Sequence, residues 1–491
     1  MSPSPMPTPT LPEVYAAREV GNRPTLPSPR CPNLPEVTTV EELLPFLESV
    51  ARRPYSTGLW PAWDLQADER VLARVTSWHD PLVVAALEET LKRFGTKYTI
   101  QHEDKGDPFQ WKGSDEVDYY LARTKELANW MEEWEEFDRT GKYDKILMGY
   151  GGPILAQRKI KIQRLPFIVP EQVASPAHMT PAEVLVAIDE WTWERVRRAR
   201  TVHLTDPEGT DIRFTNHDDY WSDERTVYRR DHVARTYSSN TPYGETYLPG
   251  HVWGRPSFHI PKEDGNGVIA GTMNHIAPFP RMEMQIENSA IVDIRGGGEF
   301  GDKLRDLAHR TRDTQYPGFN SPGIMQWWEA SIGTNPKIHR PRAGYPTGYN
   351  CGLYERMRAG IVHIGYGTVI SSDQEREAAK RGDLVGHWHI HLNFPTYVAE
   401  GPDGDDVIIE NGHLKALDDP GVRAIAAKYG DPDEILREDW IPAIPGLNLP
   451  GDYNRDYAAD PMDWTLTELH VCRKYHPLFM QMIGAETASC H

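Results

Sequence analysis

Residues 387–393 of the chain read HWHIHLN, so that histidines alternate with large apolar side chains. Alternate side chains of a β-strand point to the same face, which places the three histidines on one face and Trp388 and Ile390 on the other. The apolar face has to pack against other apolar groups. We therefore predict that this stretch is a buried strand, and that its sheet presents a row of imidazoles.

The sequence around this stretch also favours sheet. Beyond about residue 216 it consists of short β-like runs with many Gly, Pro and aromatic residues, and residues 290–294 and 360–364 are predicted strands. Apolar positions at helical spacing predict a helix over residues 299–310, and residues 418–438 are expected to add one or two more. The second half is therefore predicted to have a sheet-rich α+β fold.

The first half alternates strand and helix patterns. Residues 71–76 are predicted to form a strand, and Asp80 is predicted to cap a helix over residues 81–95. Residues 180–183 read TPAE, a capping box that predicts a further helix. Residues 201–214 are predicted to form two strands around a turn. This order of elements predicts an α/β domain.

A chain of 491 residues is too long for one ordinary hydrophobic core and is expected to divide into domains. The predicted parts are a proline-rich extended arm (residues 1–35), an α/β domain (36–215), an α+β metal-binding catalytic domain (216–445) and a C-terminal extension (446–491). An arm without a core of its own gains order only against a partner. We therefore expect a homodimer or a higher homo-oligomer.

Composition and charge argue against several classes of partner. A formal net charge of -19 disfavours binding to phosphate backbones, so no nucleic-acid partner is expected. No apolar run is long enough to cross a bilayer and no signal-peptide pattern opens the chain, so we expect no membrane partner and a cytoplasmic location. The four cysteines are scattered, which favours reduced thiols and leaves any metal ion to nitrogen and oxygen ligands.

Histidines on one face of a strand suit a divalent transition metal, although three along one strand are too spread out for all of them to bind one ion. The alternative is a row of surface histidines with ordinary hydrogen bonds. His363 lies in an apolar run that ends in glycines, where it is either a metal ligand or a buried core histidine. Glu329 follows two tryptophans, and burial of its carboxylate would call for a metal ion or an arginine.

Several short segments resemble one known superfamily over roughly residues 60 to 445. In the first half they are residues 68–72 (DERVL), the Asp80-Pro81 helix start and residues 205–211 (TDPEGTD). In the second half they are residues 248–250 (LPG), 332–336 (IGTNP), 362–364 (VHI) and 391–394 (HLNF). Together they resemble the superfamily that joins the M29-type metalloaminopeptidases with the 2,5-dihydroxypyridine 5,6-dioxygenases.

The peptidase branch of this superfamily implies a site with two metal ions, which the chain matches in part. Glu329, His363 and His391 fall on metal-ligand positions of that branch. The aspartate expected two residues after the last histidine is Asn393, and an amide cannot bridge two cations as a carboxylate does. The segment where a first glutamate belongs, residues 248–252, contains none. These departures argue against a dinuclear peptidase and leave one metal site.

A mononuclear site with histidines and at most one carboxylate is the usual arrangement for non-haem Fe(II) that acts on dioxygen. The resemblance therefore predicts a non-haem Fe(II)-dependent dioxygenase, an oxygenase that cleaves or oxidises a small hydroxylated aromatic or N-heterocyclic acid with O2. Two alternatives stay open. One is an M29-like metallohydrolase, an aminopeptidase with a divergent site for Zn, Co or Mn. The other is a binding protein on the same scaffold that has lost its metal.

The residues expected to carry this function fall into three groups. The predicted metal ligands are His391, His363 and Glu329, and which of His251, His387 and His389 join them stays open. The resemblance implies that a histidine beside the iron removes the hydroxyl proton of the substrate, and the candidates are His389 and His251. The residues expected to contact the substrate are Trp328, Trp388 and Asn393, the first two by stacking on its ring.

Overall fold

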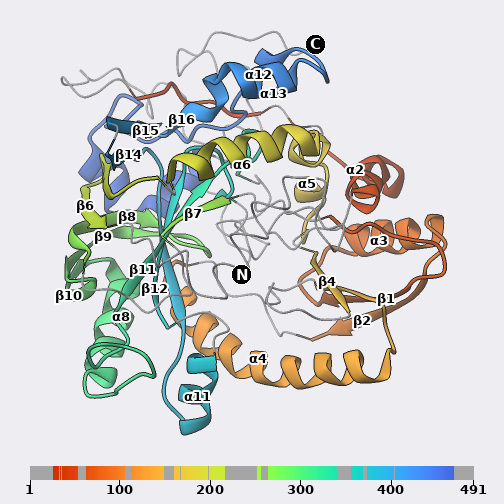
Figure 1. The fold of residues 1–491 in the computed structure, drawn as a ribbon, viewed down its shortest axis with the longest axis horizontal. Coiled ribbons are helices and arrows are strands. Elements are labelled where there is room, and N and C mark those ends of the chain that lie inside the picture. Colours follow the sequence, from red (N-terminus) through yellow and green to blue (C-terminus); the bar gives the residue numbers. More distant parts are fainter. Residues whose placement is uncertain are drawn as a thin grey trace, which may run out of the picture.

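The computed structural model combines helices with several β-sheets in a mixed α/β fold whose second half is rich in sheet (Figure 1). It describes residues 26–32, 34, 36–53, 62–104, 112–148, 160–165, 167–196, 198–215, 251–255, 264–340, 355–368, 373–402 and 404–468. Within these ranges, no helix has the length and apolar character that crossing a membrane requires.

A parallel sheet forms the first part of the described chain, on the right of Figure 1. Its strands, in spatial order, are β2 (Lys97–Glu103), β1 (Arg70–Thr76), β3 (Lys145–Met148) and β4 (Lys161–Arg164). The helices of this part are α2 (Val40–Arg52), α3 (Pro81–Arg93) and the long α4 (Asp115–Thr140). The predicted strand at residues 71–76 is confirmed, and its apolar residues pack against α2 and α3 in one core.

Two helix starts that look equally clear in the sequence differ in the structure. The Asp80 carboxylate accepts a hydrogen bond from the Leu82 amide at 2.8 Å, so the predicted cap of α3 is confirmed. Helix α6 (Ala182–Val196) is also present, but its predicted capping box is wrong. The buried Thr180 hydroxyl has no hydrogen-bond partner among the described residues. The Glu183 carboxylate instead accepts hydrogen bonds from Lys428 and Tyr429, at 2.6 and 2.7 Å.

A large antiparallel sheet joins strands from both halves of the sequence. Its strands, in spatial order, are β10 (Ala290–Gly296), β9 (Pro278–Glu287), β8 (Asn266–Met273), β6 (Thr210–Thr215), β5 (Thr201–Asp206), β14 (Thr396–Gly401), β15 (Gly404–Glu410) and β16 (His413–Leu414). The strand pair predicted at residues 201–214 is confirmed as β5 and β6. This pair lies in the middle of the sheet, between β8 and β14. Strands from both sides of residue 215 therefore pair with each other. The domain limits expected from the sequence stay a prediction.

A second antiparallel sheet holds the histidine stretch. Its strands, in spatial order, are β13 (His387–Leu392), β12 (Val362–Gly367), β11 (Trp327–Gly333) and β7 (His251–Arg255). Every residue of β13 is buried, which confirms the predicted buried strand. Ile390 approaches Gly271 of β8, so the apolar face of β13 packs against the large sheet while its histidines point the other way.

The remaining described helices of the second half include those predicted from apolar spacing. They are α8 (Gly298–Thr311), α11 (Asp373–Arg381), α12 (Pro420–Ala426) and α13 (Pro432–Ile435). The end of the proline-rich arm packs on its own chain, because Arg30 and Ile441 exchange backbone hydrogen bonds at 2.9 Å. Cys31 is disulfide-bonded, so the expectation of four reduced thiols is wrong, and the other three cysteines lie outside the described residues.

Candidate metal centre

The candidate centre lies on one face of the sheet formed by β11, β12 and β13. Strand pairing sets His391 beside His363, and it sets His389 and Glu329 on either side of Gly365. The four titratable side chains are at most 4% exposed. Buried polar groups usually have partners, and two more distant segments supply some of them here.

Gly365 provides the space in which the polar side chains meet. A Cβ atom at this position would overlap His387 Nε2 and would lie 2.6 Å from Glu329 Oε2. Real Cβ atoms do not approach other atoms this closely, so neither side chain could hold its place beside a larger residue. The absence of a side chain at Gly365 therefore forms a cradle for the carboxylate and the imidazole.

Glu329 is the carboxylate at the middle of this cradle. Its Oε2 lies 2.7 Å from His387 Nε2, and its Oε1 lies 3.1 Å from His363 Nε2 and 3.0 Å from the Ser331 hydroxyl, which donates to it. Burial would raise the pKa of Glu329, but the contacts with His363 and His387 lower it well below its ordinary value. Glu329 is therefore an anion that holds two imidazoles.

The contacts of His387 leave two explanations for its approach to Glu329. Its Nδ1 lies 3.0 Å from the Thr368 carbonyl oxygen, which can only accept, so Nδ1 carries a proton. In a neutral ring Nε2 then bears a lone pair, and it would face a carboxylate oxygen at 2.7 Å. Two acceptors cannot approach so closely unaided. Either Nε2 carries a second proton that it donates to the carboxylate, or both groups bind one metal ion after a small increase in their separation.

His389 is oriented by a carboxylate that belongs to α4. Its Nδ1 lies 3.2 Å from Glu116 Oε1, and its backbone amide donates to Glu116 Oε2 at 3.3 Å. This arrangement directs His389 Nε2 toward the cluster, as the partners of metal-binding histidines commonly do. Burial raises the pKa of Glu116 well above its ordinary value, against the opposing effect of the amides of His389 and His275. Burial also lowers the pKa of His389 well below its ordinary value.

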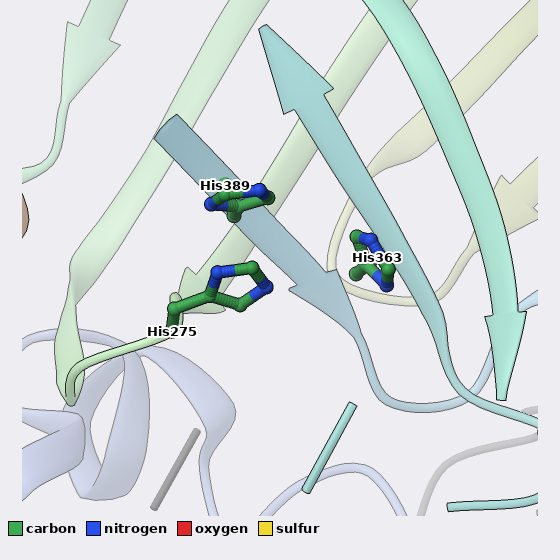
Figure 2. A group of neighbouring side chains, drawn as sticks. All are labelled: His275, His363 and His389. Carbon is green, nitrogen blue, oxygen red and sulfur yellow. The ribbon is translucent and has the colours of Figure 1, made fainter. Parts of the chain in front are cut away.

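His275, from the turn between β8 and β9, packs against the cluster. Its ring stacks on His389, with the ring centroids 3.4 Å apart and 26° between the planes (Figure 2). Its Nε2 accepts from Arg356 Nη1 at 3.2 Å, so Nδ1 carries the proton of the neutral ring and donates to the Tyr120 hydroxyl oxygen at 2.8 Å. Burial lowers the pKa of His275 well below its ordinary value.

Two sets of buried ligand atoms are close enough to hold one ion: His275, His363 and His389, and Glu329, His387 and His389. The ligand atoms of each set lie within 4.8 Å of one another, and ligands placed about 2.0–2.2 Å from one ion are roughly 3 to 4 Å apart. The set with Glu329 fits an ion better, because its carboxylate offsets the positive charge. In the other set, His275 already accepts a hydrogen bond from a cation.

The structure brings several of the sequence-predicted residues together and sets others apart. Glu329, His363 and His389 belong to the cluster described above. His391 borders it with its ring centroid 5.0 Å from that of His275, and neither of its ring nitrogens has a hydrogen-bond partner among the described residues. The buried Asn393 amide likewise has no partner among them.

The remaining sequence-predicted residues are the two tryptophans expected to stack on the substrate, Trp328 and Trp388, and the second candidate base, His251. Trp388 lies in the hydrophobic core on the face of β13 opposite to the histidines, a position that does not favour a substrate contact. The side chains of Trp328 and His251 lie outside the described part of the structure, although β11 and β7 place their backbones in the same sheet.

Sequence reasoning missed Glu116 and His275. Glu116 stands in the acidic first turn of a helix, where carboxylates usually interact with the helix N-terminus and solvent. His275 is an isolated histidine in a turn. Neither has a local pattern that marks it, because only the packing of α4 and of the β8–β9 turn against β13 brings them to the cluster.

Comparison with known proteins shows a distant likeness to solved structures only. No protein-family model matches the chain, and no curated protein matches it. Among solved structures, a 2,5-dihydroxypyridine dioxygenase from Pseudomonas putida is similar with a TM-score of 0.44 and 14% sequence identity, over 77% of this chain and 98% of that chain. At this distance the likeness establishes no family, so the chemistry of the site rests on the residues described above.

Proposed function

We propose that this chain is a mononuclear non-haem Fe(II)-dependent oxygenase that acts on a small hydroxylated aromatic or N-heterocyclic acid together with dioxygen. The proposed ligands of the ion are Glu329, His387 and His389, with His363 beside them. The observation that carries the proposal is the buried set of Glu329, His387 and His389, whose ligand atoms lie within 4.8 Å of one another and include a 2.7 Å contact between His387 and Glu329. Two histidines and one carboxylate are the donor set typical of non-haem Fe(II) enzymes that use dioxygen.

The carboxylates of the cluster favour one ion over two. Sites for two catalytic metal ions need groups that clamp both ions, and carboxylates usually supply the bridge. Among the described residues of the cluster, the carboxylate besides Glu329 is Glu116, whose oxygens are engaged by His389 and by the His275 amide. This distribution supports an oxygenase rather than an M29-like aminopeptidase with two ions.

The residues around the ligands orient them and keep water away. The Thr368 carbonyl and the Glu116 carboxylate each hold the Nδ1 side of one histidine, so that His387 and His389 both present Nε2 to the ion. The ligand side chains are almost fully buried, which strengthens every charge interaction within the cluster. When bound there, Fe(II) would bind the substrate and dioxygen side by side and pass electrons from the electron-rich ring to dioxygen.

His391 is the residue that we assign to proton transfer. A hydroxylated substrate has to lose its hydroxyl proton, and the acceptor needs a ring nitrogen that is not already engaged. His391 offers such a nitrogen beside the cluster, whereas His389 acts as a ligand in this arrangement. His251, the other residue expected in this role, stays an alternative. The sequence instead predicted that His391 binds the ion. The metal content of His391→Ala distinguishes these two roles.

Oxygen consumption after anaerobic loading with Fe(II) tests the proposal. The loaded protein is mixed with air-saturated buffer and with hydroxypyridines, aminophenols, catechols or hydroxybenzoates. We expect one of these classes to trigger oxygen uptake together with loss of its aromatic absorbance. Glu329→Gln and His389→Ala should abolish the uptake. His413→Ala, which removes a histidine bound to Glu438 and Asp418 instead, is the control that should retain it.

The opposite outcome is equally specific. If the protein binds two divalent ions and releases amino acids from amino-acid amides without consuming oxygen, the M29-like hydrolase replaces the oxygenase.

A further inference from the structure

Strand β2 forms one edge of the parallel sheet, and among the described residues it pairs with β1 alone (Figure 1). It is seven residues long, and each of these residues is exposed or half-buried. It contains no proline, and its pairing with β1 runs without a register shift. An exposed edge of this length and regularity tends to pair with a further strand unless the chain blunts it.

The other edges of the described sheets are short, irregular or covered. Strand β4 has four residues and β16 has two, and β7 lies against α6. Strand β10 contains a register shift, and its Ile291 amide donates to the Met325 carbonyl. Strand β13 is fully buried, and its His389 amide donates to Glu116 of α4. Of the sheet edges in the described part of the structure, β2 is therefore the one left open.

Alternate residues of β2 direct their backbone groups away from the sheet. Toward β1, the Lys97 amide donates to the Glu69 carbonyl and the Glu103 carbonyl accepts from the Ser77 amide. The odd-numbered residues of β2 therefore serve the ladder with β1. The even-numbered residues, whose amides and carbonyls point outward, are Tyr98, Ile100 and His102. No hydrogen bond within the described part of the chain uses these outward groups.

We propose that β2 pairs with β2 of a second copy of this chain, in antiparallel orientation about a two-fold axis at Ile100. Self-pairing over the whole strand sets Ile100 opposite its own copy and Tyr98 opposite His102 of the partner subunit. These are the residues whose backbone groups point outward, so each outward amide meets an outward carbonyl. The same surface serves both copies, and the two parallel sheets join into one continuous sheet.

The side chains of β2 complement one another in this register. Lys97 falls opposite Glu103 of the partner subunit at both ends of the pair, so opposite charges face each other. Within its own chain Lys97 lies 3.1 Å from Asp68, and Glu103 lies 3.8 Å from Arg74, so the new pair extends two existing ion pairs. On the other face, the half-buried Ile100 packs against the core of α2 and α3 and gains its own copy as a neighbour. Charge and apolar character both favour a second copy as the partner.

Sedimentation of the full-length protein tests the assignment through one amide group. His102→Pro removes an outward amide and leaves the ladder with β1 intact, whereas His102→Ala removes the side chain and keeps the amide. We expect an even number of chains in the unaltered protein and in His102→Ala. His102→Pro should contain half that number, with an unchanged circular dichroism spectrum. A monomeric unaltered protein, or a folded His102→Pro variant that assembles like the unaltered protein, would overturn the proposal.

Disulfide trapping tests the register and decides the question even if His102→Pro fails to fold. Residue 99 lies opposite residue 101 of the partner subunit, with roughly 4.5 Å between their Cα atoms, a separation that a disulfide can bridge. Co-expressed Thr99→Cys and Gln101→Cys chains should therefore form a covalent dimer on mild oxidation. Either variant alone should not, because its two introduced cysteines would lie about 7 to 8 Å apart.

The unaltered protein, oxidised in the same way, shows how much cross-linking its four native cysteines produce. Failure of the co-expressed chains to cross-link above this background would rule out the proposed pairing, as would equal cross-linking in either variant alone. The interface does not depend on the metal centre, so this outcome is independent of the oxygenase proposal.

Discussion

Gly365 is the residue on which the geometry of the centre depends most directly. We predict that Gly365→Ala abolishes metal binding while the fold is retained, because the added methyl group would displace His387 and the Glu329 carboxylate, whose Oε2 lies 2.6 Å from the site of the new Cβ. The change should also reduce stability by about 1 to 3 kcal/mol, as overpacking usually does. Metal analysis and thermal unfolding of the same preparation measure both effects.

A matched glycine elsewhere controls for the loss of backbone freedom. Gly401 lies at the end of β14, in a different sheet from the cluster, and a Cβ there would meet the Gly404 carbonyl at 3.2 Å. Gly401→Ala should therefore keep the full metal content. If Gly365→Ala keeps the full metal content, the ion binds elsewhere and the proposed ligands are wrong.

At the scale of single residues, the sequence predicted one side of the centre. The alternation of His387, His389 and His391 follows from strand geometry alone, and the burial of Glu329 could be expected from the tryptophans before it. Glu116 and His275 could not be found in this way. Each comes from an element that reaches the cluster only through tertiary packing, and their identity as partners depends on distances that no local pattern encodes.

At the scale of the element, the two helix starts allow a direct comparison of caps. Asp80 caps α3 through the Leu82 amide, so Asp80→Ala should lower the free energy of unfolding by about 1 kcal/mol. The Thr180 hydroxyl is buried without a partner among the described residues, so Thr180→Val should be neutral or stabilising. Chemical denaturation of both variants measures the difference. A loss of equal size in Thr180→Val would show that its hydroxyl does cap α6.

The wrongly predicted capping box of α6 shows why the start of a helix is harder to predict than the helix itself. The helix is present although the capping box that predicted it is not, because burial of its apolar face stabilises it. The side chain of Glu183 had two possible uses, a local bond to its own backbone or a contact with Lys428 and Tyr429. A contact over this separation in sequence cannot be read from the segment itself.

At the scale of the whole molecule, the β5–β6 turn couples the large sheet to the end of the described chain. Tyr453 donates to Glu208 at 2.8 Å, and the Phe394 amide donates to Asp206 at 2.9 Å. Burial, and then the neighbouring Glu208, raises the pKa of Asp206 to about 8, and burial raises the pKa of Glu208 to about 7. The folded chain therefore holds protons here that the unfolded chain releases.

The raised pKa values of Asp206 and Glu208 predict that the folded chain loses stability as the pH rises. For a carboxyl group whose pKa is higher in the folded state, the stabilisation is complete below the pKa of the unfolded chain and is lost as the pH rises through the folded pKa, here between about 4 and about 8. Asp206→Asn should flatten this dependence. The free energy of unfolding of both proteins is measured by denaturant at pH 6 and pH 8. An equal change in this free energy between the two pH values in both proteins would contradict the raised pKa of Asp206.

The arrangement of the large sheet explains what the sequence could not give at this scale. Individual strands were predictable from β-like runs and turns, and β5, β6, β10 and β12 are all present. The central place of the β5–β6 pair was not, because sheet order depends on pairing between distant segments. The same limit applies to the centre, which needs α4 from the first half and β13 from the second.

The metal content of the full-length protein tests the central claim most directly, namely that a cation held by the cradle at Gly365 is a metal ion. After anaerobic loading and removal of unbound metal, we predict one ion per chain in the unaltered protein and in His391→Ala, and none in Glu329→Gln or His387→Ala. Loss of the ion from His391→Ala with retention in His387→Ala would instead support the ligands expected from the sequence. An unaltered protein without any bound ion would contradict the account, because the close contact of His387 with Glu329 would then be an ion pair with a protonated ring.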